Sequence, residues 1–585
     1  MPNGRLEDIA VVGSPSTNTE LTVDLLQEAT AERLVGALVA FNATQDGHPI
    51  TSVGQIVGIE LRNRWHEDSV FRNLIKRTGE IPPITNRQDT RIASLVVGAT
   101  FVQRENGYDP EVLGMVPPTG TRVLRVDQAL LDRLLAAYQE EIFYLGQAYA
   151  NDVLYPMWFK HFGSGPGGAG EAYHLAIFGK TGSGKSVLAK NILLAYARHR
   201  PPKQMGLLVI DPQGEFARDF GSGAATGSYR LDYRVACQKI GRKVEVRRVP
   251  DMRLDRWNLF ADLISRTQLF PRLSIRTQDY IRNAADVLCE RLREQKVPLT
   301  DIYKKESFEA GLKLLKDERS LKQIYSGKEG RERLKEMIED SKVTEPLFTD
   351  AWLPVAKLFR EMDDAGKRRP ATEEIVDLVL RRDDRCIVIM DLSGAGLSQP
   401  DKQTFWSEEV QALLLSRIME ALIRKAEELY GKEPLNALVI LDEAHRLAGT
   451  EYFDEDSDRA ELRRRLIDGV RTTRKYGLGW MFISQSMASI HKSIIEQCRI
   501  LFFGFGLAIG DEFRRLKEFA GGDDRSMDLY RSFRDPHSFP RDELREFPFM
   551  AVGPVSPLAF SGRPLFFTAF TDPTEFLRAN RFAGE

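Results

Sequence analysis

The fold of this chain is decided by thirteen consecutive residues, His174-Leu175-Ala176-Ile177-Phe178 and then Gly179-Lys180-Thr181-Gly182-Ser183-Gly184-Lys185-Ser186. An apolar run followed by G-x-x-x-x-G-K-S predicts a strand, a phosphate-binding loop and a helix N-terminus. The glycines let backbone N–H groups surround phosphate oxygens, Lys185 places a positive charge on the β- and γ-phosphates, and Ser186 offers a hydroxyl to Mg²⁺. The helix expected over 186–199 turns its positive end toward the phosphates. The loop at 179–186 is therefore predicted to bind a nucleoside triphosphate.

Strands alternate with helices from residue 171 onward. Near-continuous apolar runs are typical of parallel strands that are covered on both faces. Such runs occur at 207–211, 386–392, 437–443, 480–485 and 500–504. The pattern predicts a doubly wound α/β nucleotide-binding domain.

The first 125 residues have a different pattern. Short β-like runs separated by turn residues, with Gly54, Gly58 and Gly98 in or beside them, predict a small β-barrel or sandwich. Residues 126–160 have apolar residues at helical spacing and are expected to be helical. The Gly-rich stretch 163–170 is either a domain linker or a surface loop leading into the first core strand, and a loop is favoured.

A long stretch rich in Arg, Lys, Glu and Leu separates two of the core strands. It has helical spacing and no strand signal, so a helical insertion is expected, with a separate regulatory domain as the alternative. The predicted segments are a β-barrel at 1–125, the first part of the ATPase core at 126–251, a helical insertion at 252–380, the second part of the core at 381–560, and a C-terminal brace or tail at 561–585.

An acidic pair follows the apolar run at 438–441. Four apolar residues and then Asp442-Glu443 have the form of a Walker B strand. Asp442 is expected to support Mg²⁺ through water, and Glu443 is expected to orient or deprotonate the attacking water, because phosphoryl transfer depends on positioning and electrostatic stabilisation. The alternative is a strand that ends in acids where the chain reaches the surface.

Further polar residues follow other core strands. Asp211-Pro212-Gln213-Gly214-Glu215 closes the strand at 207–211, where Asp211 and Glu215 are expected near the nucleotide and its metal, although a simple Asp-Pro turn explains them as well. Gln485 ends the strand at 480–485, and strand C-termini in such sheets face the ligand. Gln485 is therefore a candidate γ-phosphate sensor, or a strand-end residue without a ligand.

Two arginines precede that last strand. Arg471 or Arg474 is a candidate arginine finger for the nucleotide of a neighbouring subunit, and a solvated basic helix face is the alternative. The stretch Leu392-Ser393-Gly394-Ala395-Gly396 is similar to the signature of ABC transporter ATPases. It directly follows a strand and lies far upstream of Asp442, so it is interpreted as a loop.

Composition limits the classes of function. Hydrophobic residues make up 42% and charged residues 28%, and the formal net charge is −2. A protein that coats DNA by bulk charge is usually basic, so any DNA contact is expected to be local, in a groove or pore. The four cysteines are scattered without a C-x-x-C pair, no apolar run reaches the length of a membrane helix, and no signal pattern is present, so a cytoplasmic location without membrane contact is expected.

In combination these motifs resemble the HerA family of hexameric DNA-translocating ATPases, relatives of the FtsK pumps. The matching elements are the N-terminal barrel, the loop at 179–186, the segment 210–215, the helical insertion, the residues 441–445, and Arg474-Lys475-Tyr476-Gly477-Leu478-Gly479 leading into the strand that ends at Gln485. The resemblance covers most of the chain. It departs from the family at Gln213, where His is frequent, and in the long acidic stretch after Walker B, which contains Asp454, Glu455, Asp456 and Asp458.

The resemblance implies a RecA-like P-loop ATPase core and a homo-hexamer that hydrolyses ATP with Mg²⁺ at its subunit interfaces. It implies double-stranded DNA in the central pore and Arg474 as the finger acting in trans. It also implies a partner at the barrel, either a NurA-like nuclease, as in DNA repair, or a defence effector such as a sirtuin-like NADase or another nuclease, as in antiviral defence. A helicase-like DNA translocase is expected. The alternatives are a ring scaffold in which ATP controls a partner effector without translocation, and a conjugative coupling ATPase, which the missing membrane segment disfavours.

Overall fold

The computed structural model describes residues 7–78, 88–105, 107–159, 171–199, 204–221, 229–380, 384–397, 399, 406–432, 435–449, 458–541, 544–558 and 563–582. The chain forms two compact units. Unit 1 comprises residues 1–201, 225–231 and 481–585, and unit 2 comprises residues 202–224 and 232–480. Two predicted loops, the Gly-rich stretch 163–170 and the acidic stretch 454–456, lie outside the described residues, as does the side chain of Asp458.

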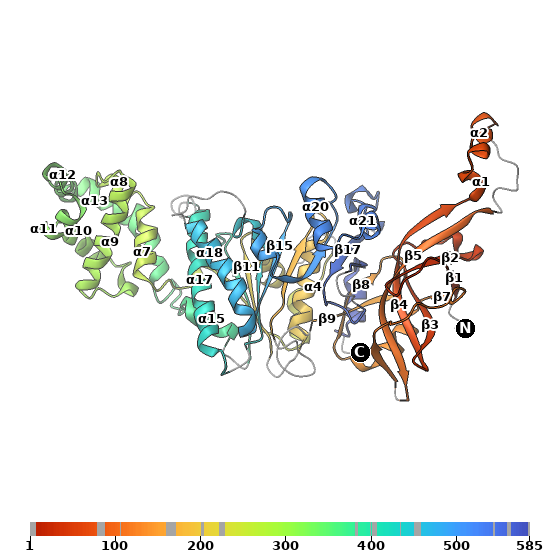
Figure 1. The fold of residues 1–585 in the computed structure, drawn as a ribbon. Coiled ribbons are helices and arrows are strands. Elements are labelled where there is room, and N and C mark those ends of the chain that lie inside the picture. Colours follow the sequence, from red (N-terminus) through yellow and green to blue (C-terminus); the bar gives the residue numbers. More distant parts are fainter. Residues whose placement is uncertain are drawn as a thin grey trace. The chain divides into compact units, whose positions relative to one another are not determined.

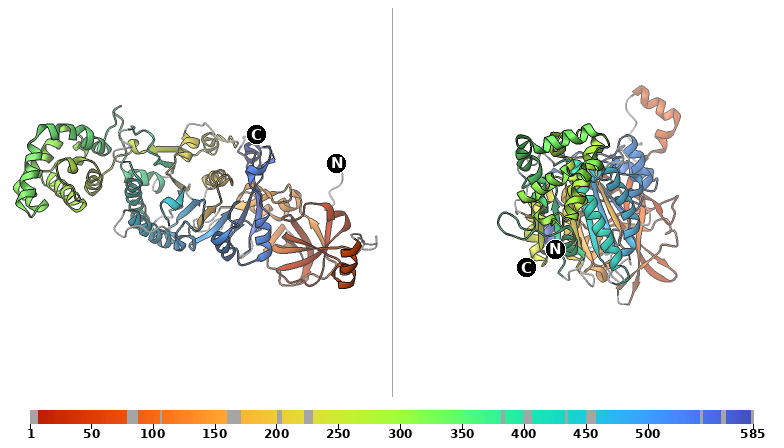
Figure 2. Two further views of the ribbon diagram at one scale, coloured as in Figure 1. Left: turned by 90° about the horizontal axis from the view of Figure 1, so that it is seen from above. Right: turned by 90° about the vertical axis from the view of Figure 1, so that its left-hand side faces the viewer.

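Unit 1 begins with the predicted β-barrel, whose strands curve round a common interior (Figure 2, left). Its strands are β1 (Asp8–Val12), β2 (Glu20–Leu25), β3 (Leu38–Gln45), β4 (His48–Arg62), β5 (Thr90–Arg104), β6 (Gly107–Glu111) and β7 (Arg122–Arg125). They follow the order β2-β1-β7-β3-β4-β5, and pairing between β2 and β5 closes the ring. The pairing of β4 with β5 shifts register near Gly54, where an added Cβ would lie 2.4 Å from the carbonyl oxygen of Val96. Only glycine fits that bend.

The barrel carries a helical excursion that the strand pattern did not predict. Between β4 and β5 the chain forms α1 (Arg64–Glu67) and α2 (Ser69–Thr78), which extend beyond the strands in Figure 1. Asn63 caps α1 by accepting hydrogen bonds from the N–H groups of Trp65 and His66. A single cap residue within a polar stretch is weak evidence for a helix, and the apolar patterns of the two flanking strands are much stronger.

Unit 1 also contains a mixed sheet. Its strands are β8 (Ile142–Ala148), β9 (Leu154–Trp158), β10 (His174–Phe178), β15 (Leu478–Ser484), β16 (Cys498–Phe503), β17 (Phe547–Val552) and β18 (Leu565–Ala569). The order is β15-β10-β16-β17-β18-β8-β9, with β10 parallel to β15 and β16 and the remaining pairs antiparallel. The division of the chain between the two units falls inside β15. Helix α4 (Lys185–Arg198) follows β10.

The prediction of helix over 126–160 is wrong for most of that stretch. Helix α3 (Gln128–Leu134) is present, but β8 and β9 follow it. Both strands are rich in aromatic and branched residues that favour strands, and Pro156 is tolerated because β9 lies at the sheet edge. Pairing of β8 with β18, which is remote in sequence, decides the outcome.

The C-terminal residues pack on their own chain. Helix α22 (Pro573–Ala579) follows β18, and Phe576 and Phe582 make ring contacts with Phe143 of β8. The side chain of Asn580 both donates to and accepts from the backbone of Tyr144. Contact of this segment with a neighbouring subunit stays a prediction.

Unit 2 contains the parallel strands β12 (Val244–Arg248), β13 (Ile387–Asp391), β11 (Gly206–Asp211) and β14 (Ala437–Leu441), in that order. The described residues of β11, β13 and β14 are all buried, as expected for strands covered on both faces. The helices α15 (Thr372–Leu380), α17 (Glu408–Leu429) and α18 (Asp458–Thr473) lie together beside them in Figure 1. All five predicted core strands are present, including β15 and β16 in unit 1.

The predicted helical insertion is also present in unit 2, as the green group of helices in Figure 1. Its main helices are α7 (Trp257–Ser265), α8 (Leu269–Arg272), α9 (Gln278–Glu294), α10 (Lys305–Lys316), α11 (Glu318–Ile324), α12 (Lys328–Glu339), α13 (Ser341–Leu347) and α14 (Leu353–Ala356). Trp352 is buried among Phe260 and Phe308, and its Nε1 donates to the carbonyl oxygen of Ile302 at 2.8 Å. The insertion therefore has a small aromatic core of its own.

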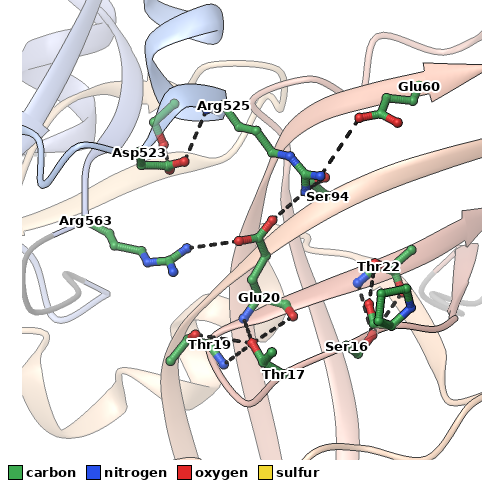
Figure 3. A network of polar contacts seen from close by, with 12 residues as sticks. Ser16, Thr17, Thr19, Glu20, Thr22, Glu60, Ser94, Asp523, Arg525 and Arg563 are labelled. Carbon is green, nitrogen blue, oxygen red and sulfur yellow. Dashed lines mark hydrogen bonds and ion pairs between the residues drawn. The ribbon is translucent and has the colours of Figure 1, made fainter. Parts of the chain in front are cut away.

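Barrel and sheet of unit 1 are joined by polar contacts on helix α21 (Asp524–Arg531). Arg525 donates to Glu20 of β2 and to Ser94 of β5, and Arg563 lies 3.8 Å from the same Glu20 carboxylate. Figure 3 shows both arginines converging on Glu20, with Glu60 on the far side of Arg525. Gln55 of β4 also exchanges two hydrogen bonds with the backbone of Phe566. No helix among the described residues is long and apolar enough to cross a bilayer.

Candidate functional site

The glycine-rich loop connects β10 to α4 in unit 1. Gly182 and Gly184 have φ values of 82° and 85°, a left-handed conformation that L side chains rarely adopt. A Cβ on Gly179 would lie 2.5 Å from the Oγ of Ser183, so this glycine is required by close packing. Helix α4 begins at Lys185, whose side chain is only 9% exposed. The strand, loop and helix start predicted from residues 174–186 are therefore present.

A second loop holds the glycine-rich loop in place. The N–H of Gly504 donates to the carbonyl oxygen of Phe178 at 2.7 Å, and the N–H of Lys180 donates to that of Phe505 at 2.9 Å. The hydroxyl of Tyr530 donates to the carbonyl oxygen of Gly504 at 2.6 Å. The loop after β16 and helix α21 thus fix one side of the phosphate-binding loop.

Gln485, predicted at the end of β15, does reach this loop. The Oγ1 of Thr181 donates to the Oε1 of Gln485 at 3.1 Å. The contact follows from the parallel pairing of β15 with β10, which brings the carboxyl ends of both strands to one edge of the sheet. A role as γ-phosphate sensor stays a prediction.

The structure adds two residues that the motifs did not indicate, His537 and Phe547. A Cβ on Gly182 would lie 2.1 Å from the Nε2 of His537, and a Cβ on Gly184 would lie 3.0 Å from the ring of Phe547. Both residues come from a segment some 350 positions after the loop in sequence. His537 follows Pro536 and belongs to no recognisable motif, so the sequence gives no indication that it lies beside the phosphate-binding loop.

The predicted acidic residues lie in unit 2, where Asp211 ends β11. Its Oδ1 accepts hydrogen bonds from the N–H groups of Gly214 (2.8 Å) and Glu215 (3.1 Å), and its Oδ2 accepts one from Ala217 (2.8 Å). These bonds cap the start of α5 (Glu215–Gly221), so the turn alternative accounts for the position of Asp211. Burial, with the nearby carboxylate of Asp391, raises the pKa of Asp211 to about 6 despite those bonds.

Asp442 and Glu443 follow β14. Burial, together with the carboxylates of Asp211, Glu215 and Glu443, raises the pKa of Asp442 to about 7. Glu443 has a φ of 46°, an unusual left-handed backbone for a residue with a side chain. Its carboxylate accepts a hydrogen bond from the Nε2 of Gln213 at 3.4 Å and lies 3.2 Å from the Nδ1 of His445. The two predicted Walker B acids therefore belong to one cluster of buried negative charge.

This cluster of carboxylates could supply one or two ligands to a divalent cation whose other ligands are waters and phosphate oxygens. Among the described residues no set of three His, Cys, Asp or Glu side chains converges as a cation site. Mg²⁺ in phosphoryl-transfer sites keeps several waters and takes one or two carboxylates plus phosphate oxygens, so a complete protein cage is not needed. Burial and, after it, repulsion by the neighbouring carboxylates raise the pKa of Asp442, and a nearby cation would relieve that repulsion.

The two candidate arginine fingers lie at the amino end of β15. Arg474 begins the short helix Arg474–Tyr476, and Arg471 is exposed in the last turn of α18. Gln485 follows the other end of the same strand, and a seven-residue strand spans about 23 Å at about 3.3 Å per residue. Neither arginine is therefore brought to the Gln485 end of its own β15.

One family model matches the central part of the chain. Residues 172–422 match the family model described as Helicase HerA, central domain. Among solved structures, VirB4 of Thermoanaerobacter pseudethanolicus is 14% identical with a TM-score of 0.38, over 74% of this chain and 97% of that one. The bacterial conjugative coupling protein TrwB is 11% identical with a TM-score of 0.37, over 68% and 85%.

A third structure is the genome packaging NTPase B204 from Sulfolobus turreted icosahedral virus 2 in complex with ATP-gammaS, 8% identical with a TM-score of 0.27 over 68% of this chain and 98% of that one. No curated protein matches the sequence. The predicted fold class, a RecA-like P-loop core with an N-terminal β-barrel and a helical insertion, is confirmed. The resemblance predicted from the motifs is confirmed by the family model, which matches residues 172–422 of this chain.

Proposed function

We propose that this chain is the subunit of an ATP-dependent, hexameric DNA translocase of the HerA type. The observation that carries the proposal is the glycine-rich loop at the carboxyl end of buried strand β10, inside a segment that matches the HerA central domain. Its left-handed glycines and nearly buried Lys185 have the form that triphosphate binding requires.

In the proposed reaction, Lys185 binds the β- and γ-phosphates, and Gln485 contacts the γ-phosphate through its position beside Thr181. Ser186 and Asp442 would hold Mg²⁺, which neutralises phosphate charge when bound. Glu443 accepts the proton of the attacking water as its oxygen bonds to the γ-phosphorus and the bond to the ADP oxygen breaks. Arg474 acts on the nucleotide of a neighbouring subunit, since it lies at the far end of its own β15.

The energy of hydrolysis is proposed to move double-stranded DNA through the ring. With a net charge of −2, the chain needs local basic surface for this contact. A nuclease or defence effector at the barrel is proposed as the partner.

ATP turnover with and without linear double-stranded DNA tests the function. Wild-type protein is expected to hydrolyse ATP faster when DNA is present, and Lys185→Ala is expected to lose at least 100-fold in turnover under both conditions, because the phosphate charge is left uncompensated. Lys328→Ala, at an exposed position of α12 in the helical insertion, is the control and is expected to keep most of the activity.

Hydrolysis that DNA does not change would contradict the translocase and favour the ring scaffold. Full turnover in Lys185→Ala would contradict the site itself.

A further inference from the structure

The C-terminal half of unit 1 covers the phosphate-binding loop with two side chains. The imidazole of His537 takes up the space that a side chain on Gly182 would need, with the Nε2 at 2.1 Å and the Cδ2 at 2.5 Å from the added Cβ. The ring of Phe547, the first residue of β17, stands in the same relation to Gly184. Both left-handed glycines of the loop are therefore in contact with this one segment.

The backbone around His537 is held firmly. Asp535 caps the short helix Pro536–Ser538 by accepting a hydrogen bond from the N–H of His537 at 2.9 Å. Ser538 donates twice to the carbonyl oxygen of Asp535, from its N–H at 2.9 Å and from its Oγ at 2.7 Å. The ring of Pro536 is buried, and its fixed φ removes further freedom. The histidine is thus preorganised against the loop, although its own side chain is exposed.

The same segment is anchored to the loop from a second direction. Phe533 packs on the ring of Tyr530 at 5.0 Å between centroids, and the Tyr530 hydroxyl donates to the backbone of Gly504. The N–H of Gly504 donates to Phe178 at the end of β10, and the carbonyl oxygen of Phe505 accepts a hydrogen bond from the N–H of Lys180 in the loop. His537 and the loop therefore belong to one continuous packed group.

An imidazole in this position is close to any bound phosphate. Phosphate oxygens in such loops lie about 2.9 Å from the backbone nitrogens. Since a Cβ is bonded directly to the Cα, the Nε2 of His537 lies against the Gly182 backbone, within reach of a phosphate that this backbone binds. A ring N–H of His is a hydrogen-bond donor in both the neutral and the charged form.

We propose that His537 is a nucleotide-contacting residue, donating from Nε2 to a phosphate oxygen of the nucleoside triphosphate bound at 179–186. The proposal rests on the proposed function, since it assigns a further contact to the same site. It makes the segment that follows α21 a sensor of whether the loop is filled. Because His537 contacts phosphate and not the attacking water, it contributes to affinity more than to the chemical step.

Equilibrium binding of a fluorescent ATP analogue to the full-length protein with Mg²⁺, together with steady-state hydrolysis, tests this assignment. His537→Ala is expected to raise Kd and KM by about 10- to 150-fold, the range of a lost hydrogen bond to a charged group, and to change kcat by less than about threefold. His537→Gln keeps a donor near the Nε2 position and is expected to recover most of the affinity. His48→Ala, at an exposed histidine of the barrel, is the matched control.

Wild-type affinity in His537→Ala would overturn the inference, and so would equal losses in the Ala and Gln variants with a lowered melting temperature, which indicate a packing role. The proposed function fails separately, when the wild-type protein binds no ATP or when Lys185→Ala binds it normally.

Discussion

Two buried carboxylates of unit 2 lie at strand ends. Asp211 and Asp442 end neighbouring parallel strands, and both have raised pKa values because burial disfavours their charged forms. Backbone N–H groups compensate Asp211, whereas Asp442 is raised further by three other carboxylates. Such strain is typical of a site that is completed by a bound cation and nucleotide.

Asp442→Asn is expected to stabilise the protein in the absence of Mg²⁺ and nucleotide. The pKa of Asp442 is about 7 in the folded chain and ordinary in the unfolded chain, so its favourable contribution, present below about pH 4, is lost as the pH rises toward 7. The neutral amide avoids that loss, so the variant is expected to gain about 1–3 kcal/mol at pH 8. The gain shrinks toward pH 4.

Urea unfolding in EDTA at several pH values measures this difference. Asp468→Asn, at an exposed position of α18, is the control and is expected to follow the wild-type pH profile. Parallel profiles for Asp442→Asn and wild type would contradict the prediction.

Among single residues, the sequence predicts those that belong to a local motif. The loop at 179–186 is contiguous, so its covalent order already places Lys185 and Ser186 at the helix start. Gln485 was also predictable, because parallel strands bring their carboxyl ends to one edge. His537 and Phe547 were not, since only tertiary packing of β17 and the segment before it brings them to the loop.

At the scale of elements, α21 has a double role in unit 1. Its first turn carries Arg525, which contacts the barrel (Figure 3). Its last turn carries Tyr530, which bonds to the loop after β16. A helix of eight residues spans about 12 Å and transmits a shift at one end to the other as a rigid rod. This element physically connects the barrel with the phosphate-binding loop.

Arg525→Ala is expected to destabilise unit 1. The substitution removes hydrogen bonds to Glu20 and Ser94 and leaves the Glu20 carboxylate with Arg563 alone among the partners in Figure 3. A loss of about 1–2 kcal/mol is expected, or about 2–4 °C in melting temperature. Thermal unfolding monitored by fluorescence measures it.

Arg514→Ala provides the comparison, because Arg514 forms an exposed ion pair with Asp511 on the neighbouring helix α20 (Gly510–Phe519). Exposed pairs contribute little, so its melting temperature is expected to match that of wild type. Equal shifts in both variants would argue against the barrel contact as the cause.

Elements with a strong local pattern were predicted correctly, and those that depend on remote partners were not. The buried strands β11, β13 and β14 are continuous apolar runs that only parallel strands explain. Strands β8 and β9 have a mixed pattern, and their pairing with β18 depends on residues far along the chain. The helices α1 and α2 lie between two long strands. In α2 the apolar residues Val70, Phe71, Leu74 and Ile75 stand at helical spacing, so the sequence did hold a local signal for this helix, which the strand pattern around it obscured.

For the whole molecule, the position of Arg474 bears on the proposed ring. A residue at the amino end of β15 is suited to a neighbour's nucleotide and not to the Gln485 end of its own strand. Heterologous contacts that close into a ring place the same surface of every subunit against the next active site. A finger supplied in this way makes hydrolysis depend on assembly.

Mixed rings test that dependence. Glu443→Ala and Arg474→Ala are each expected to abolish ATP turnover when alone. In a 1:1 mixture that is allowed to exchange subunits, about a quarter of the interfaces combine an intact Glu443 with an intact Arg474 from the neighbour, so about a quarter of wild-type turnover is expected if sites act independently. The same mixture made with Arg471→Ala distinguishes the two arginines.

A mixture that stays inactive at every ratio would count against a finger acting in trans. The finger would be assigned to Arg471 if Arg474→Ala keeps turnover when alone, while Arg471→Ala loses it alone and recovers it in the mixture with Glu443→Ala.

The pairing of β18 with β8 can form only after nearly the whole chain has been synthesised. Phe567 pairs with Ala148, and the two partners lie 419 positions apart in the sequence. At about 5–20 residues per second a ribosome needs roughly 20–80 s to make that interval. During this time β8 and β9 leave the ribosome long before the strand that will cover their edge, and an uncovered strand edge is prone to pair with other chains. A newly made copy is thus exposed to misassembly until its last strand has been synthesised. The supply of chaperones that shield strand edges is therefore expected to determine the yield of active protein.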